Sequence, residues 1–161
     1  MDFSNEEFVV YPRYGVGRVL GVSNKKFAGT NEKCLGIKFD HQNLSLFIPV
    51  HRLEKVRLRK LMSRAGIKRV IETMKARARF NPKDTHKERM AGCQEKFNTG
   101  DSIQLAEIAR DLARLSKKQE LSMEEEAICR DCINLLSREM AVCQGKDLRE
   151  VRKELEILLY R

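Results

Sequence analysis

The 161-residue sequence predicts an α+β protein, with a small antiparallel β-barrel or sheet at the N-terminus followed by a compact domain of five helices. Short runs rich in β-branched and aromatic residues, separated by turn residues, fill the first 55 positions. From residue 56 onward the apolar residues recur at helical spacing, and capping-box patterns mark several helix starts. We therefore expect two domains, residues 1–55 and 56–161.

Four strands are expected in the first domain, and a glycine-rich stretch joins the first two. Its spacing, G-x-G-x-x-x-G from Gly15 to Gly21, is one residue longer than the dinucleotide-binding fingerprint. It also leads into β-branched residues, whereas a phosphate-binding loop leads into a helix. We therefore interpret Gly15 and Gly17 as hairpin glycines that supply a positive φ or a bulge. The expected strands are residues 8–11, 18–22, 34–39 and 44–50, with AGTNE and DHQN as turns.

The pattern of the fourth expected strand, NLSLFIPV, predicts which of its side chains face outward. Because side chains alternate between the two faces of a strand, Leu44, Leu46, Ile48 and Val50 are predicted to face the core. The same alternation places Ser45, Phe47 and Pro49 on the outer face. An outward phenylalanine has two explanations: the helical domain covers it, or the strand lies at a sheet edge and accepts a strand from a partner.

Five helices are expected in the second domain. Apolar residues at helical spacing run from Ile67 to Met74 and from Leu105 to Leu115. Capping boxes begin at Thr85 and Ser122, an aspartate at Asp147 starts a similar pattern, and Gly145 is placed to end the fourth helix. The expected helices are residues 60–79, 85–97, 102–118, 123–143 and 147–160.

The net charge of +9 is concentrated in the middle of the chain. Residues 56–100 hold 13 Lys and Arg against 4 Asp and Glu, whereas the segments before and after carry +2 and −2. Such a block favours a polyanionic partner, with a solvated helical surface as the alternative. The sequence has no apolar run long enough to span a membrane and no signal peptide. Its five cysteines form no regular framework, so we expect a soluble, cytoplasmic protein.

The residue patterns predict no catalytic or metal site. His41, His51 and His86 have no cysteine or carboxylate at the spacing of a triad or metal site. Cys129 and Cys132 form a C-x-x-C, with Cys143 near the same helical stripe, but a zinc site needs a fourth ligand, usually from a second knuckle. We interpret these cysteines as buried thiols, with a thiol-based sensor as the alternative. No cofactor, small-molecule substrate or enzymatic activity is expected.

Five stretches together resemble the CarD/CdnL family of bacterial transcription regulators, over nearly the full chain: FVVYPRYGVGRV, LFIPV, KARARF, EKFNTGD and AEIARDL. The first is shared with the polymerase-interacting module of transcription-repair coupling factor, but that helicase continues into motor motifs that this chain lacks. The resemblance implies a Tudor-like N-terminal barrel that binds the β subunit of bacterial RNA polymerase by strand addition. It also implies a helical domain that touches promoter DNA at the upstream edge of the transcription bubble, stabilises the open complex, and is nucleoid-associated through the polymerase.

The resemblance also implies which residues act. On the polymerase side the family's contacts map to Lys25, Phe47, Ile48 and Pro49, although some relatives have arginines at the positions of Lys25 and Phe47.

On the DNA side, a family W-x-R-R cluster maps to His86, Lys87, Glu88 and Arg89, and Glu126 stands where some relatives carry a DNA-facing lysine. The chain contains no tryptophan, so we expect a DNA contact that is either weaker or shifted toward Arg77, Arg79 and Lys83. A freestanding architectural DNA-binding protein is the alternative function.

Overall fold

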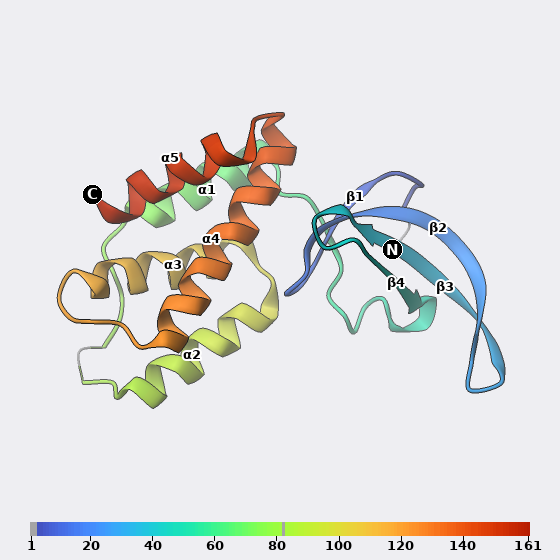
Figure 1. Ribbon diagram of the computed structural model, residues 1–161, viewed down its shortest axis with the longest axis horizontal. Coiled ribbons are helices and arrows are strands. Elements are labelled where there is room, and N and C mark those ends of the chain that lie inside the picture. The colour runs from blue at the N-terminus through green and yellow to red at the C-terminus, as the bar shows by residue number, and fades with distance from the viewer. Residues whose placement is uncertain (1–2, 82) are drawn as a thin grey trace. The chain divides into compact units, whose positions relative to one another are not determined.

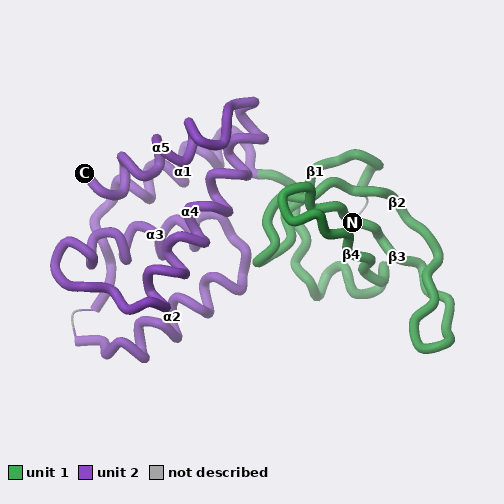
Figure 2. The backbone as a smooth tube through the Cα atoms, in the orientation of Figure 1, with its two compact units in different colours: residues 1–61 green, residues 62–161 purple. Residues whose placement is uncertain are grey.

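The structure is a computed structural model that describes residues 3–81 and 83–161. The chain divides into two compact units, residues 1–61 and 62–161 (Figure 2). The first unit is an antiparallel sheet and the second is helical, so the α+β class is confirmed. Each unit has its own hydrophobic core, and each is described below by itself.

The sheet of the first unit has five strands and is open (Figure 1). The four expected strands are present, and a short fifth strand pairs with the first. That fifth strand has only two residues, so no sequence period could have predicted it. The strands, in the spatial order β4-β3-β2-β1-β5, are β1 (Phe8–Tyr11), β2 (Gly15–Phe27), β3 (Thr30–Phe39), β4 (Leu44–Pro49) and β5 (Arg59–Lys60). The sheet is therefore not closed into a barrel, and β4 and β5 form its two edges.

The glycine-rich stretch is structural, as expected. Gly15 has a φ of 86° and starts β2 opposite Tyr11 of β1. Gly17 serves a different purpose from the predicted one, because a Cβ there would lie 2.5 Å from Cγ2 of Ile37 and 2.9 Å from a ring carbon of Phe39. Contacts this short do not occur between real side chains, so glycine is required for strands β2 and β3 to pack over their core.

The face assignment of β4 is confirmed over Leu44–Pro49. Ile48 is buried toward the core, whereas Phe47 is 37% exposed on the other face. The prediction for Val50 was wrong, since this side chain is 42% exposed. The strand ends at Pro49 and the chain turns into a short 3₁₀-helix, which breaks the alternation before Val50.

All five expected helices are present in the second unit. The first is shorter than expected, because Arg59 and Lys60 belong to β5 and Ser63 caps the helix by accepting from the N–H of Gly66. Helix α3 contacts each of the other four helices and supplies the centre of the core. The helices are α1 (Arg64–Lys75), α2 (His86–Thr99), α3 (Ser102–Ser116), α4 (Met123–Gln144) and α5 (Leu148–Tyr160).

The helix ends follow the predicted signals. Thr85 and Ser122 each form a full capping box, and Asp147 caps α5 by accepting from the N–H of Arg149. Gly145 ends α4 with a φ of 63°, a left-handed conformation that favours glycine. No helix in the described part of the chain is both long and apolar enough to cross a membrane.

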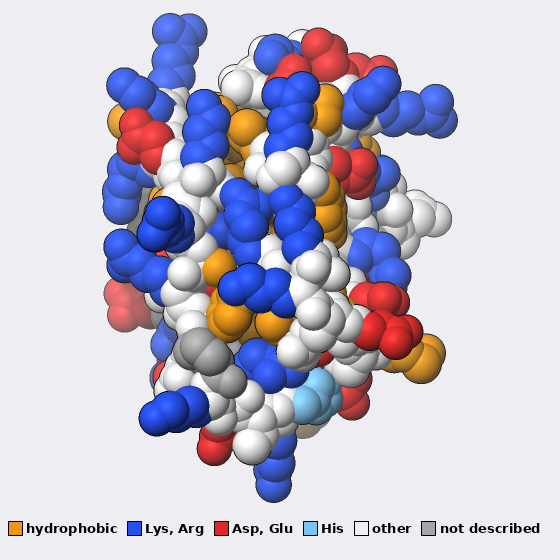
Figure 3. Space-filling view, turned by 90° about the vertical axis from the view of Figure 1, so that its left-hand side faces the viewer, with side chains coloured by type: hydrophobic (Ala, Val, Ile, Leu, Met, Phe, Trp, Pro, Cys, Tyr) orange, Lys and Arg blue, Asp and Glu red, His pale blue; other side chains and the backbone are white. Residues whose placement is uncertain are grey.

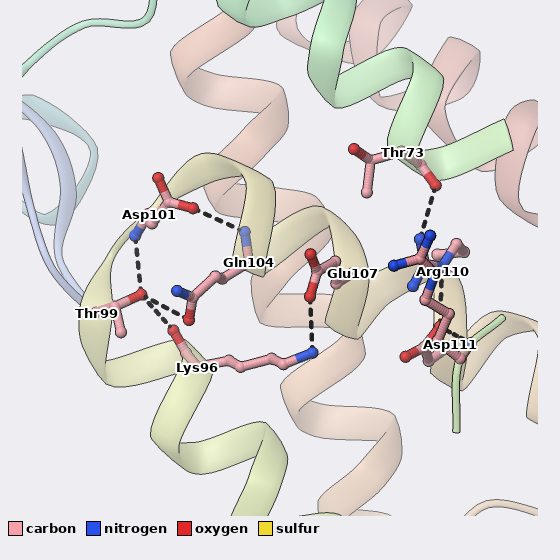
Figure 4. A network of polar contacts seen from close by, with 9 residues as sticks. Thr73, Lys96, Thr99, Asp101, Gln104, Glu107, Arg110 and Asp111 are labelled. Atoms are coloured by element: carbon pink, nitrogen blue, oxygen red, sulfur yellow. Dashed lines mark hydrogen bonds and ion pairs between the residues drawn. The ribbon is translucent and has the colours of Figure 1, made fainter. Parts of the chain in front are cut away.

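The stretch EKFNTGD contains the last residues of α2, its cap Gly100 and the cap of α3, Asp101 (Figure 4). Gly100 has a φ of 69° and ends α2, and the side chain of Asp101 accepts from the N–H of Gln104 to start α3. Lys96 and Glu107 join the two helices by an ion pair of 2.7 Å. These residues therefore set the direction in which α3 leaves α2.

Candidate functional site

The outer face of the sheet carries two apolar side chains, those of Phe47 and Leu20, and the cation Lys25 lies beside Phe47. Phe47 of β4 lies opposite Gly36 of β3, where a Cβ would be 3.1 Å from a ring carbon of Phe47 and 3.3 Å from Cβ of Leu20. Nζ of Lys25 lies 4.2 Å from the centre of the Phe47 ring, within cation–π range. Two of the predicted polymerase-binding residues, Lys25 and Phe47, are thus in contact although 22 positions separate them.

Leu20 belongs to the same outer surface, and the sequence reasoning missed it. The ladder between β2 and β3 shifts its register between Val19 and Gly21, and Gly21 has a φ of 110°. Leu20 is the extra residue of this bulge, and it is 45% exposed. The glycine after Leu20 is the sequence signal that could have indicated the bulge.

Ile48 and Pro49 complete the predicted set on β4. The side chain of Ile48 is buried in the core, so this residue can offer a partner only its backbone. Pro49 stands on the same strand, which is an edge of the sheet. An edge strand directs alternate backbone N–H and C=O groups away from its neighbour, and these groups can pair with an added strand. The geometry therefore suits strand addition with Phe47 as a side-chain anchor.

The predicted basic residues between α1 and α2 stand on an anchored segment. Arg77, Arg79 and Lys83 are exposed in the segment 76–85. The N–H of Arg79 donates to Oδ1 of Asp111 on α3 at 3.1 Å. The neighbouring Phe80 is partly buried against the helical core. The cationic side chains therefore project from a segment that is held at two consecutive positions.

Lys118 joins this basic surface from the end of α3. Its Nζ lies 5.7 Å from the centre of the ring of Phe80, the residue that follows Arg79 in the sequence. The sequence reasoning missed Lys118 because residues 101–161 carry a net charge of −2, although two consecutive lysines end the helix. Figure 3 looks onto the side of the second unit where α5 ends, and Lys and Arg side chains gather over it. We call Arg77, Arg79, Lys83 and Lys118 the basic face.

Two other cations of this region have internal roles. Arg114 donates to the backbone carbonyls of Leu159 and, at 3.0 Å, of Met74, near the C-terminal ends of α5 and α1. Arg110 is buried and donates to the carbonyl of Thr73 and to Asp111 (Figure 4). Cations at these positions satisfy the terminal carbonyls and the negative end of each helix dipole. They hold helices together and are not available to a polyanion.

The starts of α2 and α4 are bonded to each other. His86 is exposed, and its Nε2 lies 2.7 Å from Oγ of Ser122, the cap of α4. Nε of Arg89 lies 2.9 Å from Oε1 of Glu125, which is only 1% exposed. Of the predicted DNA-binding residues at this helix start, His86 and Lys87 reach solvent, whereas Arg89 faces inward and pairs with a buried carboxylate.

The environment of Glu125 keeps its carboxyl ionised. Burial alone would raise the pKa of Glu125, but the backbone N–H of Ser122 and the guanidinium of Arg89 more than offset that effect. The pKa of Glu125 therefore lies below its ordinary value. A buried carboxylate that is both hydrogen-bonded and paired links the two helix starts and supports the position of His86.

Cys129 and Cys132 of α4 lie in the core, which confirms their interpretation as buried thiols, whereas Cys143 is only partly buried. Cys129 and Cys132 are buried and free, and burial raises the pKa of each thiol. Burial also raises the pKa of Cys93, to about 11. No group of three His, Cys, Asp or Glu side chains in the described residues is arranged to hold a metal ion. A thiolate is the reactive form of cysteine, so this environment does not suit a thiol sensor.

We expect Cys129 and Cys132 to react with a disulfide reagent at pH 8 only when the helical unit opens. The reason is that both thiols are shielded and remain protonated. The measurement is the rate of thiol release in native buffer compared with the rate in 6 M guanidinium. Native rates equal to those of the unfolded chain would contradict the expectation and support a sensor.

Two family models match the chain, one for each unit. The model for the C-terminal domain of CarD matches residues 69–156, and the model for the CarD-like/TRCF RID domain matches residues 3–62. The chain therefore belongs to the CarD-like family of transcription factors, as its sequence resemblance indicated. It is also similar to YdeB of Bacillus subtilis, a protein named as a candidate transcription factor. The two are 23% identical over 146 residues, which cover 89% of this chain and 94% of YdeB.

Proposed function

We propose that this protein binds the β subunit of bacterial RNA polymerase through β4 and regulates transcription by stabilising the promoter open complex. The observation that carries the proposal is the edge strand β4, with Phe47 outward beneath Lys25. A strand added to this edge gains backbone hydrogen bonds, and Phe47 supplies the apolar anchor that makes the contact selective. Membership of the CarD-like family supports the same partner.

The helical unit adds weak DNA contacts at the upstream edge of the bubble. The basic face contacts phosphates, and His86 and Lys87 stand at an exposed helix start. These contacts do not depend on base sequence, because cations that pair with phosphates read no base edges. They are effective because attachment to the polymerase raises the local concentration of the helical unit near the promoter.

A pull-down with purified core polymerase tests the proposal directly. Tagged protein is expected to retain the β subunit, and an isolated β fragment is expected to compete. A freestanding architectural DNA-binding protein would instead bind promoter fragments with equal affinity whether polymerase is present or absent, and would retain no β subunit.

Replacing Arg77, Arg79 and Lys83 with alanine is expected to lower DNA affinity about equally for all sequences. Each cation removed from a phosphate should also flatten the dependence of log K on log salt by up to about 0.9. The measurement is fluorescence anisotropy with two unrelated promoter fragments at several salt concentrations. A triple alanine variant of Lys146, Arg149 and Lys153, near the start of α5, removes the same charge elsewhere.

Only the variant that replaces Arg77, Arg79 and Lys83 should change the slope of log K against log salt. Equal slopes for the wild type and the Arg77/Arg79/Lys83 variant would show that these cations only solvate the helical unit.

The substitution His86→Trp is expected to lengthen the life of the open complex, and His86→Ala to shorten it modestly. An indole presents a larger apolar surface to an exposed base step than a hydrated imidazole does. The measurement is the decay of open complexes after a heparin challenge, with purified polymerase and σ factor. Unchanged lifetimes for both variants, with polymerase binding intact, would show that position 86 does not touch DNA.

A further inference from the structure

A hollow lies between α2, α3 and the segment 80–84, next to the basic face. Its volume is about 140 Å³. The buried side chains of Ile108, Leu112 and Leu115 on α3 form its floor, and Phe80 lines it from the segment between α1 and α2. An apolar cavity of about 150 Å³ is known to hold one benzene ring. The hollow therefore has room for a single six-membered ring.

Gly92 keeps the hollow open on the side of α2. It stands in the interior of this helix, where glycine is less favourable than alanine. Packing does not require a glycine here, because a Cβ at Gly92 would meet no atom within 4 Å beyond its own helix backbone. None of the described side chains of α2 is fully buried. Helix α2 therefore lies over α3 without filling the space between them.

Cations of the basic face stand beside the hollow. Phe80 belongs to its lining, and Nζ of Lys118 lies 5.7 Å from the centre of the Phe80 ring. Arg79 is the residue before Phe80, and Lys83 is the residue before Asp84, which also lines the hollow. Figure 3 shows apolar side chains between Lys and Arg side chains on the side of the helical unit where α5 ends. A DNA strand whose phosphates contact the basic face would carry its bases past the hollow.

Two carboxylates of the lining are left for a ligand. The other charged lining residues already pair with groups outside the hollow: Arg89, Lys96 and Asp111. Oε2 of Glu88 accepts from the backbone N–H of the α2 cap, whereas its Oε1 and the carboxylate of Asp84 have no partner within the described residues. These oxygens only accept hydrogen bonds, and they repel anions. They suit a neutral ring that carries an amino group, and they exclude a phosphate.

We propose that the hollow binds an unpaired cytosine of single-stranded promoter DNA. The ring lies against Phe80, its amino group donates to Asp84 or Glu88, and the flanking phosphates contact the basic face. Thymine presents a carbonyl oxygen where cytosine presents the amino group, and a purine has a second ring. The inference rests on the proposed DNA contact and adds the selection of a base to contacts with phosphates alone.

Unpaired bases are available where the helical unit is proposed to act, at the upstream edge of the transcription bubble. Binding a base that is already unpaired costs less than flipping one out of a duplex. A base held in the hollow is not available to its partner strand. Occupancy of the hollow therefore opposes closure of the bubble, which is how a contact with one base would stabilise the open complex.

Fluorescence anisotropy with two short labelled single strands tests the inference. One strand contains only thymidines, and the other has a single central deoxycytidine. At low ionic strength the wild type is expected to bind the second strand about 10-fold more tightly, the discrimination that one good base contact supplies. Replacing Arg77, Arg79 and Lys83 with alanine should weaken binding to both strands by the same factor, because these cations contact phosphates.

The affinities also separate this inference from the proposed function. Equal affinity of the wild type for the two strands would overturn the cytosine site and leave the phosphate contacts standing. Binding to neither strand would overturn both the cytosine site and the DNA contact on which it rests.

Three variants locate the base. Gly92→Leu places an apolar side chain at the hollow without changing a charge, so the preference for deoxycytidine should fall to about 1-fold. Ala91→Leu is the matched control, since Ala91 is exposed on α2 outside the lining, and it should behave like the wild type. Asp84→Ala removes an acceptor that bonds no described residue, so it should fold normally and lower the preference. A preference of wild-type size in both Gly92→Leu and Asp84→Ala would overturn the inference.

Discussion

Replacing Phe47 with aspartate is expected to weaken binding to the polymerase β subunit by about 100-fold or more, the effect of losing a central anchor residue. The substitution places a charge in an apolar contact and leaves the core face of β4 untouched, since Leu46 and Ile48 point the other way. Lys25 can pair with the new carboxylate, so the sheet should stay folded. The measurement is biolayer interferometry with an immobilised β fragment.

Phe8→Asp is the matched control. Phe8 is 40% exposed on the same sheet but belongs to β1, which lies between β2 and β5 and not at an edge. It should lower affinity far less than Phe47→Asp. If Phe47→Asp bound like the wild type, the contact with the polymerase would lie elsewhere on the molecule. Circular dichroism of the helical unit should be the same for both variants.

Replacing Arg89 with leucine is expected to destabilise the helical unit by about 3–5 kcal/mol at pH 7. Glu125 would remain buried as a carboxylate without its partner, and breaking a buried pair costs this much because one charge stays uncompensated. The double variant Arg89→Leu with Glu125→Leu should recover a large part of the loss, because no charge is left in the core. Urea unfolding followed at 222 nm measures both values.

The ion pair of Arg89 with Glu125 also predicts that the stability of the helical unit depends on pH. In the wild type the pKa of Glu125 is lowered on folding, so its stabilisation is complete above the unfolded pKa, near 4.5, and disappears as the pH falls through the folded value. In Arg89→Leu burial is no longer opposed by the guanidinium, so the penalty of the variant should shrink as the pH falls from 7 to 4. A penalty that did not change with pH would mean that Glu125 is not the group left uncompensated.

The parts of the fold that could be predicted from the sequence depend mostly on signals between residues close together in the chain. A capping box, a C-terminal glycine and a helical period involve residues within a few positions, so Thr85, Ser122 and Gly145 located the ends of α2 and α4 correctly. The predicted strand alternation also held until Pro49 ended β4. It failed at Val50 because a turn changes the direction of side chains in a way that the period of two does not contain.

The functional surfaces were less predictable, because their members are distant in the sequence. Lys25 meets Phe47 only through the pairing of β2 with β3 and of β3 with β4. Lys118 comes near Phe80, 38 positions earlier in the sequence, only because Phe80 packs against the helical core.

The sequence by itself determined the two kinds of unit, the limits of helices α2 to α5 to within two residues and the outward direction of Phe47, because each depends on neighbouring residues alone. Only the tertiary structure decided which cations face solvent and which form internal ion pairs. Lys87 and Arg89 are two positions apart on one helix and carry the same charge, yet Lys87 is exposed and Arg89 pairs with Glu125. The physical reason is that a helix turns about 200° over two residues, so one side chain faces solvent and the other faces the buried carboxylate on α4.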